Sequence, residues 1–374
     1  MDPDPMNVTL PAQAIATPTR RLRVAVVGCG IGRSHIVEGY QPAPECFDLA
    51  ALCDLDPARL ASVGEEFGVR DRVTDFDALL GRDDIDVIDI CTPPGLHKSM
   101  ILKALAAGKH VVCEKPLVGS LKEVDEIIEA EARARGRLMP IFQYRFGDGA
   151  MQARRIIDAG LAGKPYVGVA ETFWKRTADY YDNPWRGRWK TELGGVLMTH
   201  AIHIHDLATF LFGPIDRVFA RTATRVNAIE VEDCVSASWR MQSGAFLSST
   251  ATLGSQDEIS RLRLHFENVT IESTHEPYSP GDGPWTILPA NDEVAAAIEE
   301  ALSDFEPVGR RFRGQMAAFH KALMASEPPP VTSRDARRSL ELVTAVYASA
   351  DSGTDVELPI GPDHPKYASW QPQD

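Results

Sequence analysis

The stretch Leu22-Arg23-Val24-Ala25-Val26-Val27-Gly28-Cys29-Gly30-Ile31-Gly32-Arg33 decides the fold of this chain. Its apolar half is typical of a buried strand, and the glycines that follow favour a tight turn into a helix. In such a turn, backbone amides approach a pyrophosphate at the helix N-terminus. The G-x-G-x-G spacing is one residue short of the dinucleotide-binding G-x-G-x-x-G, so a simple glycine-rich turn is the alternative. The candidate cofactor contacts in this turn are Gly28, Gly30, Ile31 and Gly32.

Short apolar runs alternate with helical patterns from residue 22 to about residue 142, which indicates βαβ units and a parallel sheet. One helix spans Leu121–Arg135, and Ser120 with Glu123 forms a capping box at its start. We therefore expect a Rossmann dinucleotide-binding domain over residues 21–143, after a flexible proline-containing tail over residues 1–20. The expected strands are Leu22–Val27, Phe47–Cys53, Arg72–Thr74, Val87–Cys91, His110–Cys113 and Leu138–Gln143.

The pattern changes after Arg145, where a helix over Gly149–Ala159 is followed by long segments of alternating polar and apolar residues. Such alternation predicts a large, open, mostly antiparallel sheet with one buried face. We expect residues 144–374 to form an α/β domain that binds substrate and another subunit, with a late helix over Arg334–Ala350. The expected strands here are Tyr166–Trp174, Val218–Val226, Cys234–Met241, Ala245–Leu253, Arg261–Phe266 and Val269–Ser273.

The second face of this sheet is expected to stay apolar, through Phe246, Leu247 and Leu253. An uncovered apolar sheet face favours pairing with another copy of the chain. The sequence thus predicts a homodimer or homotetramer that forms through the C-terminal sheet.

Size and charge exclude several classes of protein. A chain of 374 residues and 41.0 kDa suits two domains. With 39 basic and 53 acidic residues its formal charge is −14, which argues against nucleic acid and membrane partners. Its six cysteines show no paired spacing and look like core residues of a reducing compartment, so we expect a cytoplasmic protein.

Two further segments belong to the expected cofactor site. Asp54 ends the second strand, 24 residues after Gly30, where a carboxylate accepts both ribose hydroxyls. Its charge repels a 2′-phosphate and favours NAD, while Arg33 and Arg59 keep NADP open. The turn Thr92-Pro93-Pro94 suits a wall beside a flat ring, with His97 helping to fix it; alternatively the prolines only end a strand.

A lysine follows the fifth strand, in Val112-Cys113-Glu114-Lys115-Pro116. Pro116 prevents continuation of the strand, so Lys115 lies at the carboxyl edge of the sheet, where parallel α/β sheets bind ligands. Taken alone, Glu114 and Lys115 also fit a solvated surface pair. Their position beside the glycine turn favours a site that contacts the cofactor.

Together these segments resemble the glucose-fructose oxidoreductase, inositol dehydrogenase and MocA family, from about residue 22 to about residue 358. The Glu-Lys-Pro element and the later Gly-Gly…His-x-x-Asp element are its specific motifs. The matching residues are Gly28-Cys29-Gly30, Asp54, Thr92-Pro93-Pro94 with His97, Ala107 to Pro116, Tyr144-Arg145-Phe146, Gly194-Gly195 and His203 with Asp206.

The resemblance implies that Lys115 and His203 lie over the nicotinamide ring, with a cis peptide bond before Pro116. Oxidation of an alcohol by hydride transfer needs a base, and histidine titrates in the right range. An ammonium stabilises the developing charge on the oxygen. We assign His203 as general base and Lys115 as its electrostatic partner, with the two roles exchanged if the pKa of Lys115 is lowered.

One position departs from the family pattern: Thr199 stands where an aspartate or asparagine is common, four residues before His203. A threonine hydroxyl can bind a sugar hydroxyl, but it carries no charge to orient an imidazolium. His200 is the candidate replacement. A metal site made from His200, His203, His205 and Asp206 is the weaker alternative, because these side chains do not share one helix face.

The remaining substrate candidates come from an aromatic, basic loop over residues 180–190 and from the domain junction. Aromatic rings stack on sugars and arginine binds carboxylates or hydroxyls. Trp185 and Arg186 are the expected contacts from the loop, which alternatively packs on a neighbouring subunit. Tyr144 and Arg145 are the expected contacts from the junction.

The favoured function is an NAD(P)-dependent dehydrogenase acting on a secondary alcohol of a sugar, inositol or related polyol, a substrate class that the resemblance implies. One alternative is NAD-dependent glycoside cleavage through transient oxidation. Another is a non-catalytic NAD-binding sensor, which has no need of a base above the ring. No metal is expected.

Overall fold

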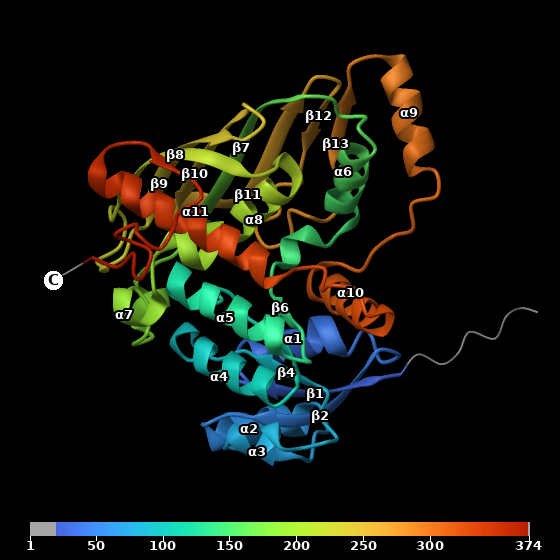
Figure 1. Cartoon of the computed structure of the whole chain (residues 1–374), viewed down its shortest axis with the longest axis vertical. Helices are drawn as coiled ribbons and strands as arrows, with labels where there is room; N and C mark the ends of the chain where they lie inside the picture. Colours follow the sequence, from blue (N-terminus) through green and yellow to red (C-terminus); the bar gives the residue numbers. More distant parts are fainter. Residues whose placement is uncertain (1–19, 373–374) are drawn as a thin grey trace, which may run out of the picture.

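The computed structural model describes residues 20–372, so the tail expected over residues 1–20 lies, except for Arg20, outside the described residues. Two sheets stand one above the other, with helices around the lower sheet and between the two (Figure 1). Every helix among the described residues is too short or too polar to cross a bilayer.

The first sheet is parallel throughout and has the strand order β3-β2-β1-β4-β5-β6. This order confirms the predicted Rossmann domain. From β1 the chain adds strands first on one side (β2, β3) and then on the other (β4, β5, β6). Parallel sheets bind ligands beyond the carboxyl ends of the two strands at such a switch, here β1 and β4. The strands are β1 (Leu22–Val27), β2 (Phe47–Cys53), β3 (Arg72–Val73), β4 (Val87–Ile90), β5 (His110–Cys113) and β6 (Leu138–Pro140).

The helices that connect these strands begin where the sequence supplies caps. Asp56 accepts hydrogen bonds from Ala58 N and Arg59 N, and a proline follows it. Ser120 caps α5 as expected, but the Glu123 carboxylate binds Gly119 N at 3.1 Å instead of closing the capping box on Ser120. The elements are α1 (Gly32–His35), η1 (Ile36–Tyr40), α2 (Pro57–Glu66), α3 (Asp77–Leu80), α4 (Pro94–Ala106) and α5 (Leu121–Arg133).

The second sheet has eight strands in the order β13-β12-β11-β7-β10-β9-β8-β14. Only the β10–β7 pair is parallel, which confirms the prediction of a mostly antiparallel sheet. The alternation expected in β9 is present, with every second side chain buried. The strands are β7 (Pro165–Lys175), β8 (Ile215–Ala223), β9 (Cys234–Met241), β10 (Phe246–Thr252), β11 (Gly254–Phe266), β12 (Val269–Glu272), β13 (Thr286–Pro289) and β14 (Val356–Glu357).

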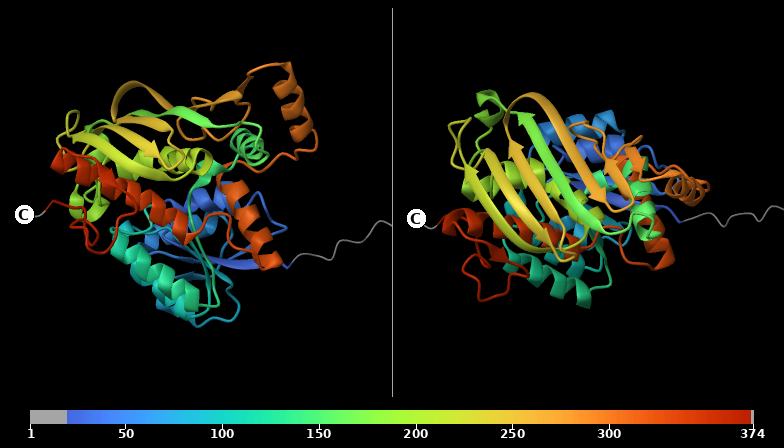
Figure 2. Two further views of the ribbon diagram at one scale, coloured as in Figure 1. Left: turned by 45° about the horizontal axis from the view of Figure 1, so that its top comes forward. Right: turned by 90° about the horizontal axis from the view of Figure 1, so that it is seen from above.

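The apolar residues expected on the open face of this sheet need correction. Phe246 is 55% exposed, whereas Leu247 and Leu253 are buried at 0% and 2%. Leu247 follows Phe246 directly, so the strand turns the two side chains to opposite faces. The exposed apolar neighbour of Phe246 is instead Val167, its partner in β7, while Phe219 in β8 is exposed two strands away. Among residues 20–372, no helix covers this face of the sheet (Figure 2, right).

The C-terminal part of the chain returns to the first domain. The unexpected helix α10 packs on η1, where a Cβ at Gly39 would lie 3.2 Å from Met316 Cγ. His320 on α10 also bonds the carbonyl of Arg20 at 2.8 Å. The proposed boundary at residues 143 and 144 thus separates the two sheets but not their helices. The remaining elements are η2 (Gln143–Arg145), α6 (Asp148–Asp158), η3 (Ala178–Asp182), α7 (Trp189–Glu192), η4 (Leu197–Ala201), α8 (Ile202–Phe212), α9 (Asp292–Leu302), α10 (Arg311–Ala325) and α11 (Ser333–Ser352).

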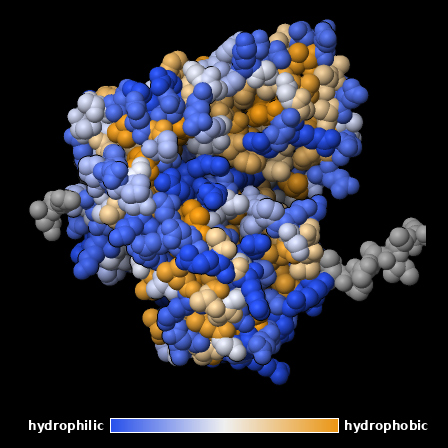
Figure 3. Space-filling view, in the orientation of Figure 1, coloured by the Kyte–Doolittle hydropathy of each residue, from blue (hydrophilic) through white to orange (hydrophobic). Residues whose placement is uncertain are grey.

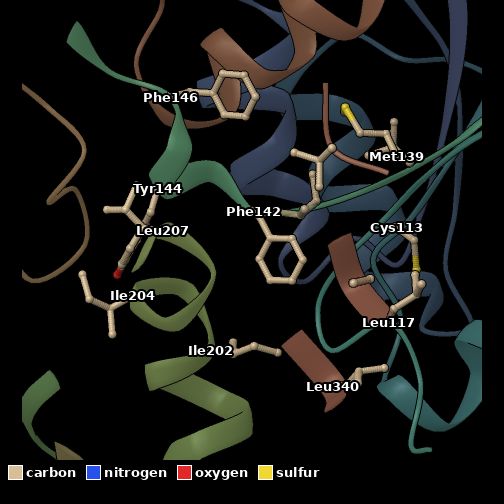
Figure 4. Packing of buried hydrophobic residues seen from close by; sticks show 14 of the residues in the cluster. Cys113, Leu117, Met139, Phe142, Tyr144, Phe146, Ile202, Ile204, Leu207 and Leu340 are labelled. Carbon is tan, nitrogen blue, oxygen red and sulfur yellow. The ribbon is translucent and has the colours of Figure 1, made fainter. Parts of the chain in front are cut away.

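One hydrophobic core runs through the junction of the two sheets (Figure 4). Phe142, just after β6, lies among Leu117, Ile202 and Leu340, which come from the β5–α5 connection, α8 and α11. Because interiors pack at the density of organic crystals, this core fixes α8 relative to the first sheet. The surface over α11 and the C-terminal segment, at the left of Figure 3, is mainly hydrophilic.

A buried ion cluster supports the same junction. The Arg145 guanidinium donates to both oxygens of Asp206 on α8, at 2.7 and 2.6 Å, and lies 3.3 Å from Asp335 on α11. Arg145 and Asp206 are almost inaccessible to solvent. The two carboxylates outweigh the effect of burial and raise the pKa of Arg145. The cluster therefore joins the junction segment to two helices.

We expect Arg145→Ala to lower the free energy of unfolding by about 3–5 kcal/mol, because the buried Asp206 carboxylate loses its counter-ion while Asp335 retains only Arg338. Lys103→Ala, which breaks an exposed pair with Asp77, should cost less than about 1 kcal/mol. Urea unfolding of both variants measures the difference. An Arg145 variant no less stable than the Lys103 variant would contradict the structural role of the cluster.

Candidate active site

A cleft of about 980 Å³ lies between the carboxyl edge of the first sheet and the second half of the chain. One wall contains the glycine turn and the turns after β2, β4 and β5. The other contains the domain junction, the start of α8 and the segment that follows β7. The cleft therefore draws residues from both halves of the molecule.

The glycine turn has the form that a pyrophosphate site requires. Gly28 has a φ of +95°, and a Cβ there would lie 2.5 Å from the carbonyl oxygen of Cys91. Gly30 and Ile31 line the cleft, and a Cβ on Gly30 would meet nothing within 4 Å. Gly32 lies outside the lining, and a Cβ there would be 2.7 Å from Val26 Cγ1, so it allows the helix to approach the strand.

The Asp54 carboxylate is held in place beside this turn. It accepts hydrogen bonds from Cys29 N at 2.7 Å and from Asp56 N at 2.8 Å. Arg59, whose side chain is half exposed, places Nη1 3.5 Å from Asp54 Oδ2. The end of β2 thus presents an oriented carboxylate next to the glycines, the arrangement that binds the hydroxyls of a ribose.

The turns after β4 and β5 are clamped together by His97. Its ring nitrogens lie 2.7 Å from the carbonyl oxygen of Thr92 and 2.9 Å from that of Pro116. Thr92, Pro93 and Pro94 line the cleft, whereas His97 is buried behind them. His97 thus supports the proline turn from behind, and its buried position does not support the expectation that it contacts the cofactor itself.

Lys115 crosses the cleft from the first sheet to the other wall. Its peptide bond to Pro116 is cis, as the family resemblance implies. Lys115 Nζ donates a hydrogen bond to the carbonyl oxygen of Thr199 at 2.7 Å. Burial lowers the pKa of Lys115 below 10.5, with Glu114 opposing and Arg186 adding to the shift.

His203 enters the same cleft from α8. Its ring stacks on Tyr144 at a centroid distance of 4.8 Å, and its Nδ1 is buried without a hydrogen-bond partner. Burial, followed by the nearby Lys115 and His200, lowers the pKa of His203 well below 6.5. At neutral pH this imidazole is therefore uncharged and able to accept a proton.

The Thr199 hydroxyl is bonded within its own helical segment, although it was expected to bind a substrate hydroxyl. It donates to the carbonyl of Gly195 at 2.7 Å and lies 2.6 Å from Nδ1 of His200. Thr199 therefore orients His200, and His203 has no carboxylate of its own at this position. Both Thr199 and His200 line the cleft.

A buried glutamate that the sequence did not reveal caps the helical segment that carries these residues. Glu232 accepts hydrogen bonds from Gly195 N and Leu197 N, each at 3.0 Å, and from the Tyr347 hydroxyl at 2.9 Å. Burial raises its pKa to about 7. No local pattern signals this role, because Glu232 lies more than 30 residues from the amides that it caps.

The aromatic, basic segment after β7 forms the outer wall. The Arg186 guanidinium lies between the rings of Tyr180 and Trp185, at 4.0 and 4.4 Å from their centroids. It also contacts Glu192 at 3.1 Å. Trp185 and Arg186 thus line the cleft as expected. Lining residues that the sequence analysis did not single out include Trp174, Arg176, Tyr278 and Arg311.

The structure separates the predicted site residues into two groups. Gly32, His97 and Arg145 do not line the cleft, and Arg145 is instead engaged by two carboxylates. The predicted residues that do line it are Gly28, Gly30, Ile31, Asp54, Arg59, Thr92, Pro93, Pro94, Glu114, Lys115, Tyr144, Trp185, Arg186, Thr199, His200 and His203.

The metal alternative considered for the α8 histidines is not supported by their directions. His205 points to the sheet and contacts Ser249 Oγ at 2.8 Å, and Asp206 is bound by Arg145. His200 and His203 face the cleft instead. These four side chains therefore form no common ligand set.

Two alanine variants test the glycine turn with NADH, the cofactor that the sequence predicts. We expect Gly28→Ala to destabilise the fold by at least about 1–2 kcal/mol, because of its positive φ and the contact with Cys91. Gly30→Ala should leave thermal stability nearly unchanged but weaken NADH binding at least about tenfold, because its methyl group fills the space of the pyrophosphate. Thermal melting and calorimetry measure both effects. Unchanged NADH affinity in Gly30→Ala would refute this placement.

Comparison with known proteins agrees with this geometry. Residues 22–142 match the model of an oxidoreductase family with an NAD-binding Rossmann fold, and residues 150–272 match the GFO/IDH/MocA C-terminal domain. An oxidoreductase of Bacillus subtilis, YrbE, is 30% identical over 91% of this chain and 97% of its own length. D-xylose 1-dehydrogenase (NADP(+)) 2 of Haloferax volcanii is 29% identical, over 88% of this chain and 97% of its own.

A solved structure shows that the similarity extends to the three-dimensional fold. The WlbA dehydrogenase of Bordetella pertussis, in complex with NADH and UDP-GlcNAcA, is 28% identical with a TM-score of 0.79, covering 92% of this chain and 100% of its own. Both domains, the glycine turn, the Glu-Lys-Pro element and the helix with His203 agree with one assignment. The chain belongs to the glucose-fructose oxidoreductase, inositol dehydrogenase and MocA family of NAD(P)-dependent oxidoreductases.

Proposed function

We propose that this oxidoreductase transfers hydride between NAD and a secondary alcohol of a sugar, inositol or related polyol. The observation that carries the proposal is the convergence of Lys115 and His203, from the two halves of the chain, on one cleft beside the glycine turn. Aromatic side chains around this cleft suit the faces of a sugar ring.

The residues divide the chemistry in the following way. Bound NAD supplies the hydride acceptor in the direction of oxidation. His203, held neutral by burial and by its cationic neighbours, accepts the hydroxyl proton of the substrate. The pKa of Lys115 is also lowered, which is the condition named for an exchange of the two roles, but Glu114 opposes this shift and the Thr199 carbonyl accepts from Nζ. We therefore propose that Lys115 remains the cation and stabilises the negative charge that develops on the same oxygen.

The names of similar proteins support the substrate class. The Haloferax protein is a D-xylose dehydrogenase, and the Bordetella structure contains a nucleotide-linked sugar acid. We propose NAD over NADP because the Asp54 carboxylate lies where a 2′-phosphate would be repelled. The Haloferax enzyme uses NADP, so cofactor choice varies among such relatives.

A substrate screen tests the function directly. Purified protein is incubated with NAD or NADP and a panel of sugars, inositols and sugar acids. Net formation of NADH with at least one of them is expected. Cleavage of a glycoside without net NADH would instead support transient oxidation, and inactivity on all of them despite NAD binding would contradict the proposal.

We also propose a homodimer or homotetramer that forms through the open face of the second sheet, and a cytoplasmic location. Val167 and Phe246 supply exposed apolar area on a face that no helix covers (Figure 2). All six cysteines are free thiols, as is usual in a reducing compartment.

Variants of the two reacting residues test the assigned roles. Lys115→Met and His203→Gln should each lower kcat by about 10²–10⁴, with NADH affinity nearly unchanged. In the wild type, oxidation should rise with pH as His203 loses its proton, at an apparent pKa below 6.5, and fall as Lys115 loses its proton below 10.5.

His205→Gln is the matched control, because His205 lies on the same helix but faces Ser249. Its kcat should remain within a few-fold of the wild-type value. Full turnover in both Lys115→Met and His203→Gln would refute the assignment.

The sheet interface is tested by Phe246→Asp, which introduces a charge on the exposed apolar face. We expect a smaller oligomer by sedimentation velocity, with secondary structure retained. Met324→Asp, at an exposed apolar position on α10, should leave the oligomer unchanged. A wild-type chain that sediments as a monomer would contradict the proposal.

A further inference from the structure

A group of buried polar side chains lies directly behind the cleft. It combines His35 of α1 and Tyr40 of η1 with Asp89 of β4, Cys91 after β4, and Glu114 at the end of β5. His35 and Asp89 are inaccessible to solvent. We infer that His35 is an imidazolium that bridges Asp89 and Glu114, and that it is a positioning residue for the ammonium of Lys115. The second part of this inference rests on the proposed role of Lys115.

The hydrogen bonds require a doubly protonated ring. His35 Nδ1 lies 2.8 Å from Asp89 Oδ2, and its Nε2 lies 2.9 Å from Glu114 Oε1. An ionised carboxylate only accepts hydrogen bonds, so both ring nitrogens must donate. A neutral ring has one N–H and would leave one carboxylate facing a lone pair inside the protein, which is costly.

Asp89 accepts hydrogen bonds from two further side chains. The Tyr40 hydroxyl donates to the same Oδ2 at 2.9 Å. The Cys91 thiol lies 3.5 Å from Oδ1, and burial raises its pKa, so that it remains a thiol and donates. Together with the His35 ring, three donors therefore point at this side chain, which acts as an acceptor toward each of them.

The charges of the bridge agree with the geometry. Burial alone would lower the pKa of His35, but the adjacent Asp89 carboxylate raises it well above 6.5. Burial likewise acts to raise the pKa of Glu114, yet the bond to His35 lowers it below 4.5. Both partners thus favour the ionised pair.

Glu114 connects this pair to the cleft. Its Oε2 accepts the backbone N–H of Lys115 at 2.9 Å while its Oε1 accepts from His35. The Glu114 charge raises the pKa of Lys115 against burial and against Arg186. The order Asp89⁻, His35⁺, Glu114⁻, Lys115⁺ places alternating charges from the interior of the sheet to the reacting ammonium.

Loss of His35 would leave Glu114 buried without its counter-charge and favour protonation of that carboxyl group. Lys115 would then face Arg186 and Glu192 of the outer wall and His200 and His203 of the α8 segment without the support of Glu114. The pKa of Lys115 should fall, and the ammonium should be lost at lower pH.

The same side chains are close enough to suggest a metal site, since ligand atoms of His35, Asp89 and Cys91 lie within 4.8 Å of one another. Both ring nitrogens, however, already face carboxylate oxygens at hydrogen-bond distance. Tyr40 also occupies the Asp89 oxygen that faces Nδ1. Protons on the two ring nitrogens therefore account for these contacts without a metal ion.

Histidine-selective ¹⁵N NMR of the whole wild-type protein tests the bridge without any variant. We expect the His35 ring, identified by the signals that are lost in His35→Gln, to have both nitrogens protonated at pH 8. A neutral His35 at that pH, or a stoichiometric divalent metal in the purified protein, would overturn the bridge. This result is independent of whether Lys115 is catalytic.

Kinetics test the link to Lys115. In His35→Gln the high-pH limb of kcat should move down by about one pH unit, whereas NADH affinity should stay close to that of the wild type. Adding Glu114→Gln to His35→Gln should cause little further shift of the limb, because Glu114 has already lost its negative charge by protonation in His35→Gln. Tyr40→Phe, which keeps the contact between His35 and Glu114, should leave the limb in place.

An unmoved limb in folded His35→Gln would refute the positioning role. If Lys115→Met retains full turnover, the proposed function fails, while the NMR result still decides the charge of His35.

Discussion

The hydrogen bond from Lys115 Nζ to the carbonyl of Thr199 is the contact on which the site depends, because it joins the edge of the Rossmann sheet to η4, the segment that leads into α8. It holds an ammonium across the cleft instead of letting it extend into solvent. The shared core around Phe142 and the Arg145 ion cluster keep the two supports of this bond in register. The two halves therefore act as one frame around the cofactor.

Burial lowers the pKa of both Lys115 and His203, but the two groups need different charges for their proposed roles. Burial lowers the pKa of His203, and no carboxylate at the position of Thr199 opposes this effect. The ring is therefore neutral, as a proton acceptor must be. Burial also acts against the charge of Lys115, but the neighbouring Glu114 opposes this effect. In this chain the main counter-charge for the cation thus comes from Glu114 on the Rossmann side, while the other side supplies the uncharged Thr199 carbonyl.

Local patterns predicted much of the fold and the cofactor half of the site. Most strands of the Rossmann domain end within one residue of the expected position, although β6 ends at Pro140 and not at Gln143. The glycine turn, Asp54 and Lys115 follow strands whose ends were predicted closely. The substrate half was harder, because Glu232 and Tyr278 reach the site only through tertiary packing. Nothing in their sequence neighbourhoods distinguishes them from other residues of the second domain.

The incorrect expectations have the same physical origin. Arg145 was expected in the cleft because its residue type suits a sugar or a carboxylate, but Asp206 and Asp335 already use its donors. Alternation separates the faces of a strand, yet the exposed face of β10 was misjudged for Leu247 and Leu253. Helix α10 was not predicted, because its apolar residues pack against η1, which lies far away in the sequence.

A crystal structure of the protein with NADH and a bound polyol would show whether Lys115 and His203 meet at one reacting carbon. We expect the nicotinamide ring between the Thr92–Pro94 turn and His203, with Lys115 Nζ and the His203 ring both within hydrogen-bond reach of one substrate hydroxyl. A nicotinamide ring outside this cleft, or a hydroxyl at the reacting carbon that neither side chain reaches, would contradict it.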